Sequence, residues 1–450
     1  MKRSKLLVLL VAILWLMCSC EEPKTSDGSK YTQYSTPMSD VPAIEDIIMY
    51  EINLRAFSVS GDLQGVIQRL PALEDLGINV IWLMPIHPIG EINSVNSPYS
   101  VKDYKEISAE YGSLEDLREL SDKAHERGMA VIMDWVANHT AWDNPWINNK
   151  SWYTLDQNYE IISPPGTNWL DVADLNHYNS SMQDAMIDAM EYWILEANID
   201  GYRCDYADGV PLDFWSKALT ELSSTPDRQL IFLAEGSRSD HYQAGFDLTY
   251  GWSFYGSMKS VFNGAAASLL FDTNSEEYSG VPEGSDILRF TTNHDESAWD
   301  ATPIVLFKGK QGALAASIAT IFMGGVPLIY TGQEVGREQS IPFFSNSPIN
   351  WNANPELLLS YQQVLELYTN SQAAKVGALS SFPDDDILCF TRSNEFETLH
   401  IMVNLRNETI QFNTPEDLQN GEWQDMLANS SLSLNSPLML DPFQFFILKQ

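Results

Sequence analysis

Four short apolar segments of this sequence end in residues that can do nucleophilic or acid–base chemistry. The residues, in chain order, are Asp134, Asn138, His139, Arg203, Asp205, Glu235, Asn293, His294 and Asp295. If the segments are parallel strands of a barrel, their carboxyl ends meet at one mouth, and the carboxylates, the arginine and the histidines converge there.

Paired carboxylates are the groups that cleavage of a glycosidic bond requires. One carboxylate attacks the anomeric carbon as a nucleophile, and the other protonates the leaving oxygen. A third acid binds sugar hydroxyls and favours a distorted ring, and an adjacent arginine keeps the nucleophile ionised. No phosphate-binding glycine loop accompanies the set, and no Ser-His-Asp order is present. The set is therefore suited to glycosidic bond cleavage.

The elements that must position these residues alternate between strand and helix. We predict strands at 47–54, 78–84, 130–136, 200–205, 230–234, 246–248, 287–292 and 326–330. We predict helices at 62–76, 114–127, 183–197, 212–222 and 312–323. Pro71 implies a kink in the first helix. Eight strands alternating with helices predict an α/β fold, a (β/α)8 TIM barrel, over residues 45–375.

Two further regions depart from this alternation. Residues 140–180 are rich in Trp, Asn and Pro and form too long a stretch for an ordinary loop, so they predict a small subdomain inserted after the third strand. From residue 387 the apolar period changes to two, which is typical of antiparallel strands. Residues 376–450 therefore predict a C-terminal antiparallel β domain, similar to a sandwich.

The N-terminus is typical of a targeting segment. Three basic residues precede an apolar run at 6–17, which is too short to span a bilayer and has the length of a secretory signal core. Ser19 before Cys20 resembles a bacterial lipoprotein signal, with Cys20 lipidated after removal of the signal peptide 1–20. Ordinary secretion is the alternative. The polar residues 21–44 predict a flexible tether.

Charge and cysteine content exclude several functions. The formal charge of −35 argues against a nucleic acid partner and against adsorption to an anionic membrane, which both need clustered Lys and Arg. After Cys18 and Cys20, only Cys204 and Cys389 remain, so neither a disulfide framework nor a zinc site is predicted. Cys204 is expected to serve packing. Membrane contact is expected only through the lipid anchor.

At the strand ends the sequence resembles the α-amylase family of glycoside hydrolases, and the resemblance covers nearly all of the mature chain. Residues 134–139 (DWVANH) match the family's DxxxNH, and 201–205 (GYRCD) resemble GFRxD with Tyr202 in place of Phe. Residues 232–235 (FLAE) and 292–295 (TNHD) match two further motifs, in the expected order. Residues 172–176 and 325–334 resemble the family's segments in the inserted domain and around the eighth strand.

The resemblance implies a role for each matching residue. Asp205 would be the nucleophile, Glu235 the general acid and then the base, and Asp295 the stabiliser of the transition state. Substrate-binding residues would be Arg203, which holds Asp205, the hydroxyl-binding His139 and His294, and Tyr99 as an aromatic platform. Asp134 would be either a structural acid or one that supports the catalytic groups.

A calcium ion is also implied, because Asn138 and Asp174 match family ligands. The sequence departs from the family after the nucleophile, however. Asp208 and Gly209 stand where many family amylases carry a Lys-His pair that shapes the leaving-group side and supplies a calcium ligand. This departure weakens two implications of the resemblance, the bound calcium ion and the contacts on the leaving-group side.

Three functions remain open. The first is a retaining hydrolase of α-glucosidic, chiefly α-1,4, bonds in starch-like glucans or maltooligosaccharides. The second is an α-glucan transferase or isomerase of the same family, and the third is a glucan-binding protein on an inactive barrel. The intact carboxylates argue against the third. We expect an exported protein that is lipid-anchored to the bacterial outer membrane; the sequence assigns no protein partner.

Overall fold

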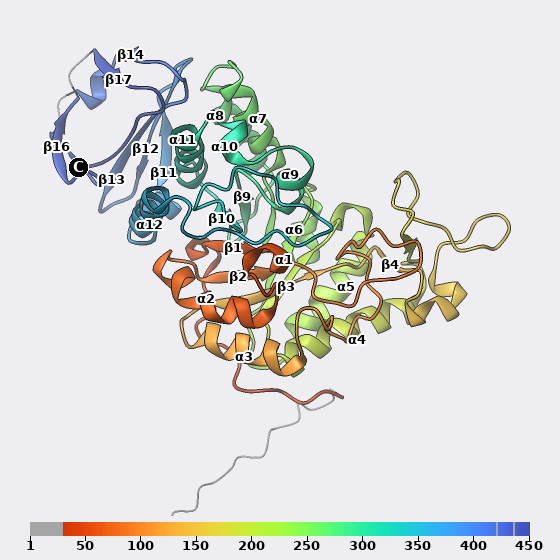
Figure 1. Ribbon diagram of the computed structural model, residues 1–450. Coiled ribbons are helices and arrows are strands. Elements are labelled where there is room, and N and C mark those ends of the chain that lie inside the picture. The colour runs from red at the N-terminus through yellow and green to blue at the C-terminus, as the bar shows by residue number, and fades with distance from the viewer. Residues whose placement is uncertain (1–29, 420–421, 435–436) are drawn as a thin grey trace, which may run out of the picture.

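The computed structural model describes residues 30–419, 422–434 and 437–450 (Figure 1). Its centre is a closed barrel of eight parallel strands, ringed by helices, with an antiparallel β domain at the C-terminal end. The predicted fold class is confirmed. The barrel strands, in order around the ring, are β1 (Met49–Ile52), β2 (Val80–Leu83), β3 (Ala130–Trp135), β6 (Gly201–Cys204), β7 (Ile231–Ala234), β8 (Leu248–Tyr250), β9 (Asp286–Arg289) and β10 (Val326–Tyr330).

One strand lies later in the chain than the sequence pattern predicts. The sixth barrel strand was expected at 246–248, but β8 begins at Leu248. Gly245 ends the preceding helix in a left-handed conformation with φ 105°, and the Phe246 N–H donates to the carbonyl of His241. The apolar Phe246 therefore belongs to the end of a helix, and its hydrophobicity gave a false strand signal.

The predicted helices are present with small shifts at their ends. They are α2 (Leu63–Asp75), α3 (Leu114–His125), α4 (Ser180–Glu196), α5 (Leu212–Ser223) and α11 (Lys310–Phe322). Side-chain caps fix the starts of α2 and α3: the side chain of Asp62 accepts from Gly65 N–H at α2, and Ser113 and Asp116 form a capping box at α3. Further helices are α1 (Leu54–Phe57), α6 (Asp240–Ala244), α7 (Trp252–Phe262), α8 (Leu269–Tyr278), α9 (His294–Trp299), α10 (Pro303–Leu306), α12 (Pro355–Thr369) and α13 (Gln372–Val376).

The segment inserted after β3 contains a small antiparallel pair. Strands β4 (His139–Ala141) and β5 (Val172–Asp174) pair with each other, and two 3-10 turns lie between them at Pro145–Asn148 and Lys150–Trp152. His139 and Asp174 are opposite each other in this pair. Both ends of the insertion thus stay close to the end of β3.

The C-terminal domain contains one large and one small antiparallel sheet. The large sheet has the order β11-β12-β13-β18-β15-β16, and the small sheet pairs β14 with β17. The strands are β11 (Ala378–Ser381), β12 (Ile387–Ser393), β13 (Thr398–Asn404), β14 (Ile410–Phe412), β15 (Glu422–Asp425), β16 (Ser430–Ser433), β17 (Leu438–Leu440) and β18 (Phe445–Lys449). Their side chains form a separate apolar core that includes buried Cys389.

The first described residues do not behave as the predicted tether. Met38, Val41 and Ile44 pack into the apolar cluster that contains Met49 and Val80 at the start of the barrel strands. The Tyr34 N–H donates to the carbonyl of Leu195. The prediction of a flexible segment is therefore wrong from residue 30 to 44, because its scattered apolar side chains are covered by the barrel. Residues 21–29, and Cys20 itself, lie outside the described residues.

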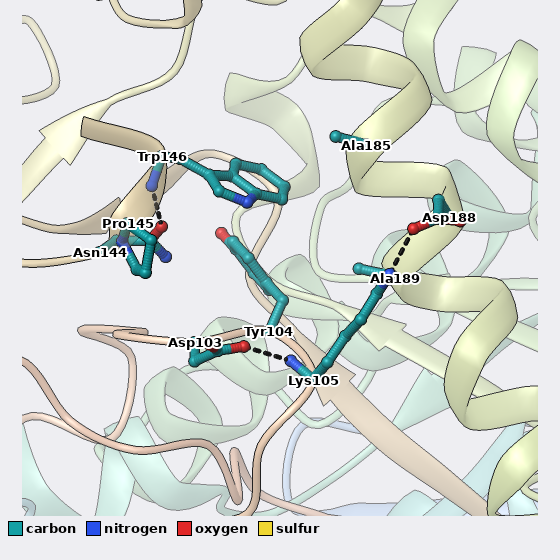
Figure 2. Close-up of a pocket in the computed structure, with 9 residues that line it drawn as sticks. All are labelled: Asp103, Tyr104, Lys105, Asn144, Pro145, Trp146, Ala185, Asp188 and Ala189. Carbon is teal, nitrogen blue, oxygen red and sulfur yellow. Dashed lines mark hydrogen bonds and ion pairs between the residues drawn. The ribbon is translucent and has the colours of Figure 1, made fainter. Parts of the chain in front are cut away.

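Near this segment, a cavity of about 150 Å³ lies between α4 and the loops around Tyr104 and Trp146 (Figure 2). Asp188 on its wall forms ion pairs with Lys105 and Lys30 and accepts a hydrogen bond from Tyr31. The N-terminal segment is thus fixed to the flank of the barrel. Across the described ranges, no helix combines the length and apolar character that crossing a membrane requires.

Candidate active site

Asp205 and Glu235 stand side by side at the barrel mouth. Cys204 on β6 and Ala234 on β7 are register partners, and each carboxylate follows its strand by one residue. The Glu235 N–H donates to the Cys204 carbonyl at 3.0 Å, which holds the two strand ends together. The two predicted reacting groups are therefore adjacent.

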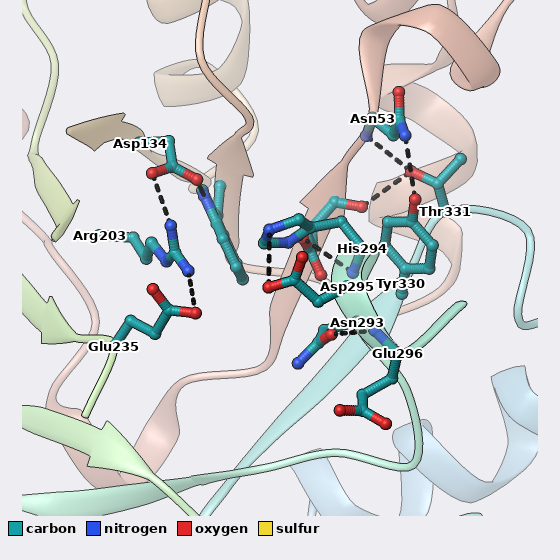
Figure 3. A network of polar contacts seen from close by, with 12 residues as sticks. Asn53, Asp134, Arg203, Glu235, Asn293, His294, Asp295, Glu296, Tyr330 and Thr331 are labelled. Atoms are coloured by element: carbon teal, nitrogen blue, oxygen red, sulfur yellow. Dashed lines mark hydrogen bonds and ion pairs between the residues drawn. The ribbon is translucent and has the colours of Figure 1, made fainter. Parts of the chain in front are cut away.

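Arg203 joins these carboxylates to a third. Its Nη1 atom lies 3.0 Å from Asp205 Oδ1 and 2.8 Å from Asp134 Oδ1, and its Nη2 lies 2.9 Å from Glu235 Oε1. Figure 3 shows the guanidinium between Asp134 and Glu235. The arginine is completely buried, so these pairs are poorly screened by solvent. Arg203 positions both predicted reacting groups, not Asp205 alone.

Asp134 contacts three other side chains of the site. Its Oδ2 atom accepts hydrogen bonds from the Trp82 indole at 3.1 Å and from the Tyr99 hydroxyl at 2.9 Å. With Arg203 on its other oxygen, this buried carboxylate is fully engaged by donors. It holds Arg203 and Tyr99 in place.

The protonation of Asp205 differs from our expectation. Burial, followed by the charge of Glu235, raises the pKa of Asp205 well above its usual value, although Arg203 opposes the shift. Burial also raises the pKa of Glu235, against the opposing effect of Arg203. The charge of Glu235 contributes to the raised pKa of Asp205, so the two carboxyl groups titrate as a pair. The arginine alone does not keep Asp205 ionised.

His294 carries a charge at neutral pH. Its Nδ1 contacts the buried carboxylate of Glu51, and its Nε2 lies 2.8 Å from the Tyr99 hydroxyl and 3.5 Å from Asp295 Oδ2. Burial lowers its pKa, but the charges of Asp295 and Glu51 outweigh burial and raise the pKa to about 9. His294 is therefore a cationic donor beside Asp295, as Figure 3 shows.

His139 is neutral in the same cavity. Burial lowers its pKa to about 4. Its Nδ1 lies 3.2 Å from the amide nitrogen of Asn138, and its ring meets that of Trp169 edge-on, with centroids 5.6 Å apart. The two histidines therefore offer different hydrogen-bonding chemistry to one ligand.

All of the predicted catalytic carboxylates and both histidines line one cavity of about 540 Å³. Tyr99 lines it too, with its ring stacked on His294 at a centroid distance of 5.4 Å. The structure adds aromatic lining residues that the sequence analysis missed, which are Trp169, Tyr206, Trp299, Phe343 and Phe344. Trp299 lies four residues after Asp295 on α9, which is about one helical turn. This spacing was the sequence signal that could have identified Trp299 as a lining residue.

Glu51 and Trp82 were also missed as parts of the site. Both are fully buried and lie on the first two barrel strands, where their side chains contact His294 and Asp134 respectively. A charged residue inside an otherwise apolar strand was the signal for Glu51.

The donor set around Asn138 and Asp174 is small for calcium. Calcium takes six to eight oxygen ligands, whereas these two side chains offer one amide oxygen and one carboxylate. In the described part of the chain, no three His, Cys, Asp or Glu side chains are grouped to hold a metal ion. The residues do not make up a calcium site by themselves, and we assign no step to a metal. Calcium binding stays a prediction.

Comparisons with known proteins agree with this geometry. Residues 24–165 match the family model for the α-amylase catalytic domain. Alpha-amylase 2 of Dictyoglomus thermophilum is 27% identical over 436 residues, which cover 90% of this chain and 73% of that protein. The crystal structure of an α-amylase from Lactobacillus plantarum superposes with a TM-score of 0.80 at 27% identity, covering 90% of this chain and 99% of that one.

A second solved structure is similar to the same extent. A noncanonic maltogenic α-amylase from Thermotoga neapolitana has a TM-score of 0.80 and 25% identity, with coverage of 90% of this chain and 98% of that one. The barrel, the carboxylates around Arg203 and these likenesses lead to one conclusion. The chain is a glycosidase that is similar to the α-amylases over about 90% of its length.

Proposed function

We propose that this glycosidase hydrolyses α-glucosidic bonds, chiefly α-1,4 bonds, of starch-like glucans or maltooligosaccharides with retention of configuration. The observation that carries the proposal is the Asp205–Glu235 pair on neighbouring strands, both held by Arg203. The names of the similar proteins, α-amylase and maltogenic α-amylase, support the substrate class.

The reaction follows a double displacement in this proposal. Asp205 attacks the anomeric carbon while Glu235 gives its proton to the leaving oxygen, which forms a covalent glucosyl-enzyme. The Glu235 carboxylate then takes a proton from water, and the resulting hydroxide displaces Asp205. Glu235 must carry a proton when it acts, and burial raises the pKa of Glu235, which favours that state.

The residues around the pair act on the sugar at the cleavage site. Asp295 would accept hydrogen bonds from sugar hydroxyls and stabilise positive charge on the ring. Cationic His294 would donate to a hydroxyl beside it, and Tyr99 would offer its ring as a platform. None of these steps requires a cofactor.

The spacing of neighbouring strands favours retention. Adjacent strands lie about 4.8 Å apart, and side chains that lean toward one mouth reach roughly the 5–5.5 Å carboxyl separation of retaining enzymes. An inverting pair needs about 6.5–9.5 Å to admit a water molecule. A single guanidinium contacts both carboxylates, which favours the shorter separation.

Timed product analysis on maltooligosaccharides tests the reaction. We expect new reducing ends to accumulate in step with substrate loss. Products longer than the substrate, with no net gain of reducing ends, would instead assign the chain to the transferases, which form the same covalent intermediate. Absence of both products would contradict any catalytic function on these substrates.

We further propose that the chain is exported and anchored to the outer membrane through a lipid on Cys20. The basic start, the apolar run at 6–17 and the Ser19-Cys20 junction support this. Residues 38–44 pack at the start of the barrel strands, opposite the mouth, so the attachment would leave the cavity open to a polymeric substrate.

A further inference from the structure

Glu51 is a fully buried carboxylate whose Oε1 atom contacts Nδ1 of His294. It lies on β1 between Tyr50 and Ile52, in a strand that is otherwise apolar or aromatic. Its Oε2 atom accepts no hydrogen bond from any residue that the structure describes. Burying a carboxylate costs free energy unless partners compensate for it. Since His294 lines the cavity, the position of Glu51 indicates a task in the active site and not in packing.

The hydrogen bonds around His294 require a hydrogen on both of its ring nitrogens. Tyr99 has one hydroxyl hydrogen, which it donates to Asp134 Oδ2 at 2.9 Å. The Tyr99 oxygen therefore accepts the hydrogen of His294 Nε2, which lies 2.8 Å away. Nδ1 faces Glu51, and an ionised carboxylate can only accept. A histidine that donates from both nitrogens is an imidazolium.

The charged groups that face His294 agree with an imidazolium. Burial lowers the pKa of His294, and the charge of Arg203 on β6 lowers it as well. The charges of Asp295 on α9 and of Glu51 on β1 outweigh both effects and raise the pKa to about 9. Tyr99 adds no charge, because burial raises the pKa of its hydroxyl well above its usual value. Glu51 is thus one of two anions that maintain the charge of His294.

The charge of Glu51 also matters for the reaction. The sugar ring gains positive charge in the transition state, so a lone imidazolium beside it would oppose the reaction. Glu51 cancels that charge, while His294 remains a strong, charge-assisted donor. We propose that Glu51 is a positioning residue of the active site, which keeps both nitrogens of His294 protonated and thereby fixes Tyr99 under the sugar at the cleavage site; this inference rests on the proposed function.

Histidine NMR tests the charge of His294 without any substrate. The chain has seven histidines, and the spectrum of His294→Gln identifies the signal of His294 in isotope-labelled enzyme. We expect this signal to titrate near pH 9 in the wild type. In Glu51→Gln, which keeps the size of the side chain and removes its charge, we expect the titration about one to three pH units lower.

Glu334→Gln is the matched control for this titration. Glu334 is also a buried glutamate, but its carboxylate accepts from the Tyr50 hydroxyl at 2.9 Å and not from His294. The titration of His294 should therefore stay near pH 9 in this variant. A titration that also stays near pH 9 in Glu51→Gln would overturn the inference. If Glu51→Gln does not fold, the wild type decides, because a neutral His294 at neutral pH would overturn it equally.

The pH dependence of fluoride release from α-maltosyl fluoride tests the role of Glu51 in the reaction. Fluoride is a good leaving group that needs no proton from Glu235, so the alkaline fall of kcat/KM on this substrate reports other groups. We expect kcat/KM of the wild type to fall through about pH 9 and that of Glu51→Gln to fall about one to three pH units lower. Glu51→Asp, which restores the charge, should restore activity at alkaline pH.

The two measurements separate failure of this inference from failure of the proposed function. A packing role would lower kcat/KM of Glu51→Gln equally at every pH, and that result would overturn the inference. Fluoride release does not depend on what accepts the sugar, so a transferase would give the same expected shift. No fluoride release by the wild type would contradict the proposed function, whereas a lowered titration of His294 in Glu51→Gln would still support the effect of Glu51 on its charge.

Discussion

Glu51 on β1 and His294 on α9 form a buried hydrogen-bonded pair, although 243 residues separate them in the chain. Closure of the barrel brings β1 beside β10 and thereby completes the ring that places these side chains together. The pair keeps a cationic histidine in the cavity, where Asp295 also contacts it.

Because of this pair, we expect the free energy of unfolding to depend on pH in the alkaline range. The pKa of His294 is about 9 in the folded state, against about 6.5 when unfolded, so its stabilisation is complete below pH 6.5 and is lost as the pH rises through 9. We expect the free energy of unfolding to fall by on the order of 3 kcal/mol over this window. Denaturant titrations at several pH values measure it, and His294→Gln should remove most of the slope.

His139→Gln is the matched control for that measurement. Because the folded pKa of His139 lies near 4, its pH-dependent effect falls between about pH 4 and 6.5. The slope between pH 6.5 and 9 should therefore survive in this variant. An unchanged alkaline slope in His294→Gln would contradict the assigned charge.

Replacement of the nucleophile should abolish turnover without unfolding the protein. We expect Asp205→Asn to lose at least ~10³-fold in kcat, because covalent catalysis needs the carboxylate. Asp208→Asn is the control: this carboxylate lies three residues away and contacts His241, not Arg203. Steady-state kinetics measure kcat, and a thermal melt shows whether each variant is folded. An active Asp205→Asn enzyme would refute the role of Asp205 as the nucleophile.

The raised pKa of Glu235 should set the alkaline limit of activity. Glu235 must be protonated when it acts, so kcat/KM should fall as the pH rises through its raised pKa. For Glu235→Gln we expect kcat/KM on maltooligosaccharides to fall about 10²–10⁴-fold. This variant should also lose the fall of kcat/KM at alkaline pH. A pH–rate profile that is unchanged in shape in this variant would mean that another group is the acid.

The configuration of the first product tests the double displacement. We expect an α-linked substrate to release an α-configured product, because two inversions at Asp205 restore the original configuration. Proton NMR of early hydrolysis, recorded before mutarotation, distinguishes the anomers. A β-anomer appearing first would overturn the mechanism and the role of Asp205 together.

Membrane attachment should depend on one cysteine. We expect Cys20→Ala to release the protein from the membrane fraction, because stable anchoring depends on acyl chains. Cys18→Ala is the matched control, since this residue would leave with the proposed signal peptide. Fractionation followed by immunoblotting measures the result. Unchanged partitioning of Cys20→Ala would rule out lipidation at this position.

The sequence by itself determined the barrel and the residues at its mouth. Apolar runs of strand length, helix spacing and stop signals are local properties, so they located the eight barrel strands to within about three residues. Asp134, Arg203, Asp205 and Glu235 sit in or directly after such runs, and strand ends in a barrel share one mouth. Their convergence therefore followed from order along the chain.

Only the tertiary structure decided how these groups affect one another. The sharing of Arg203 by three carboxylates, and the raised pKa values of Asp205 and Glu235, depend on burial and distances that no local pattern encodes. The aromatic residues that line the cavity, such as Trp169, Tyr206 and Phe343, come from segments far apart in sequence. Such loops take their shape from the surfaces they contact, as the docked residues 30–44 also show, so their positions exist only once the barrel has closed.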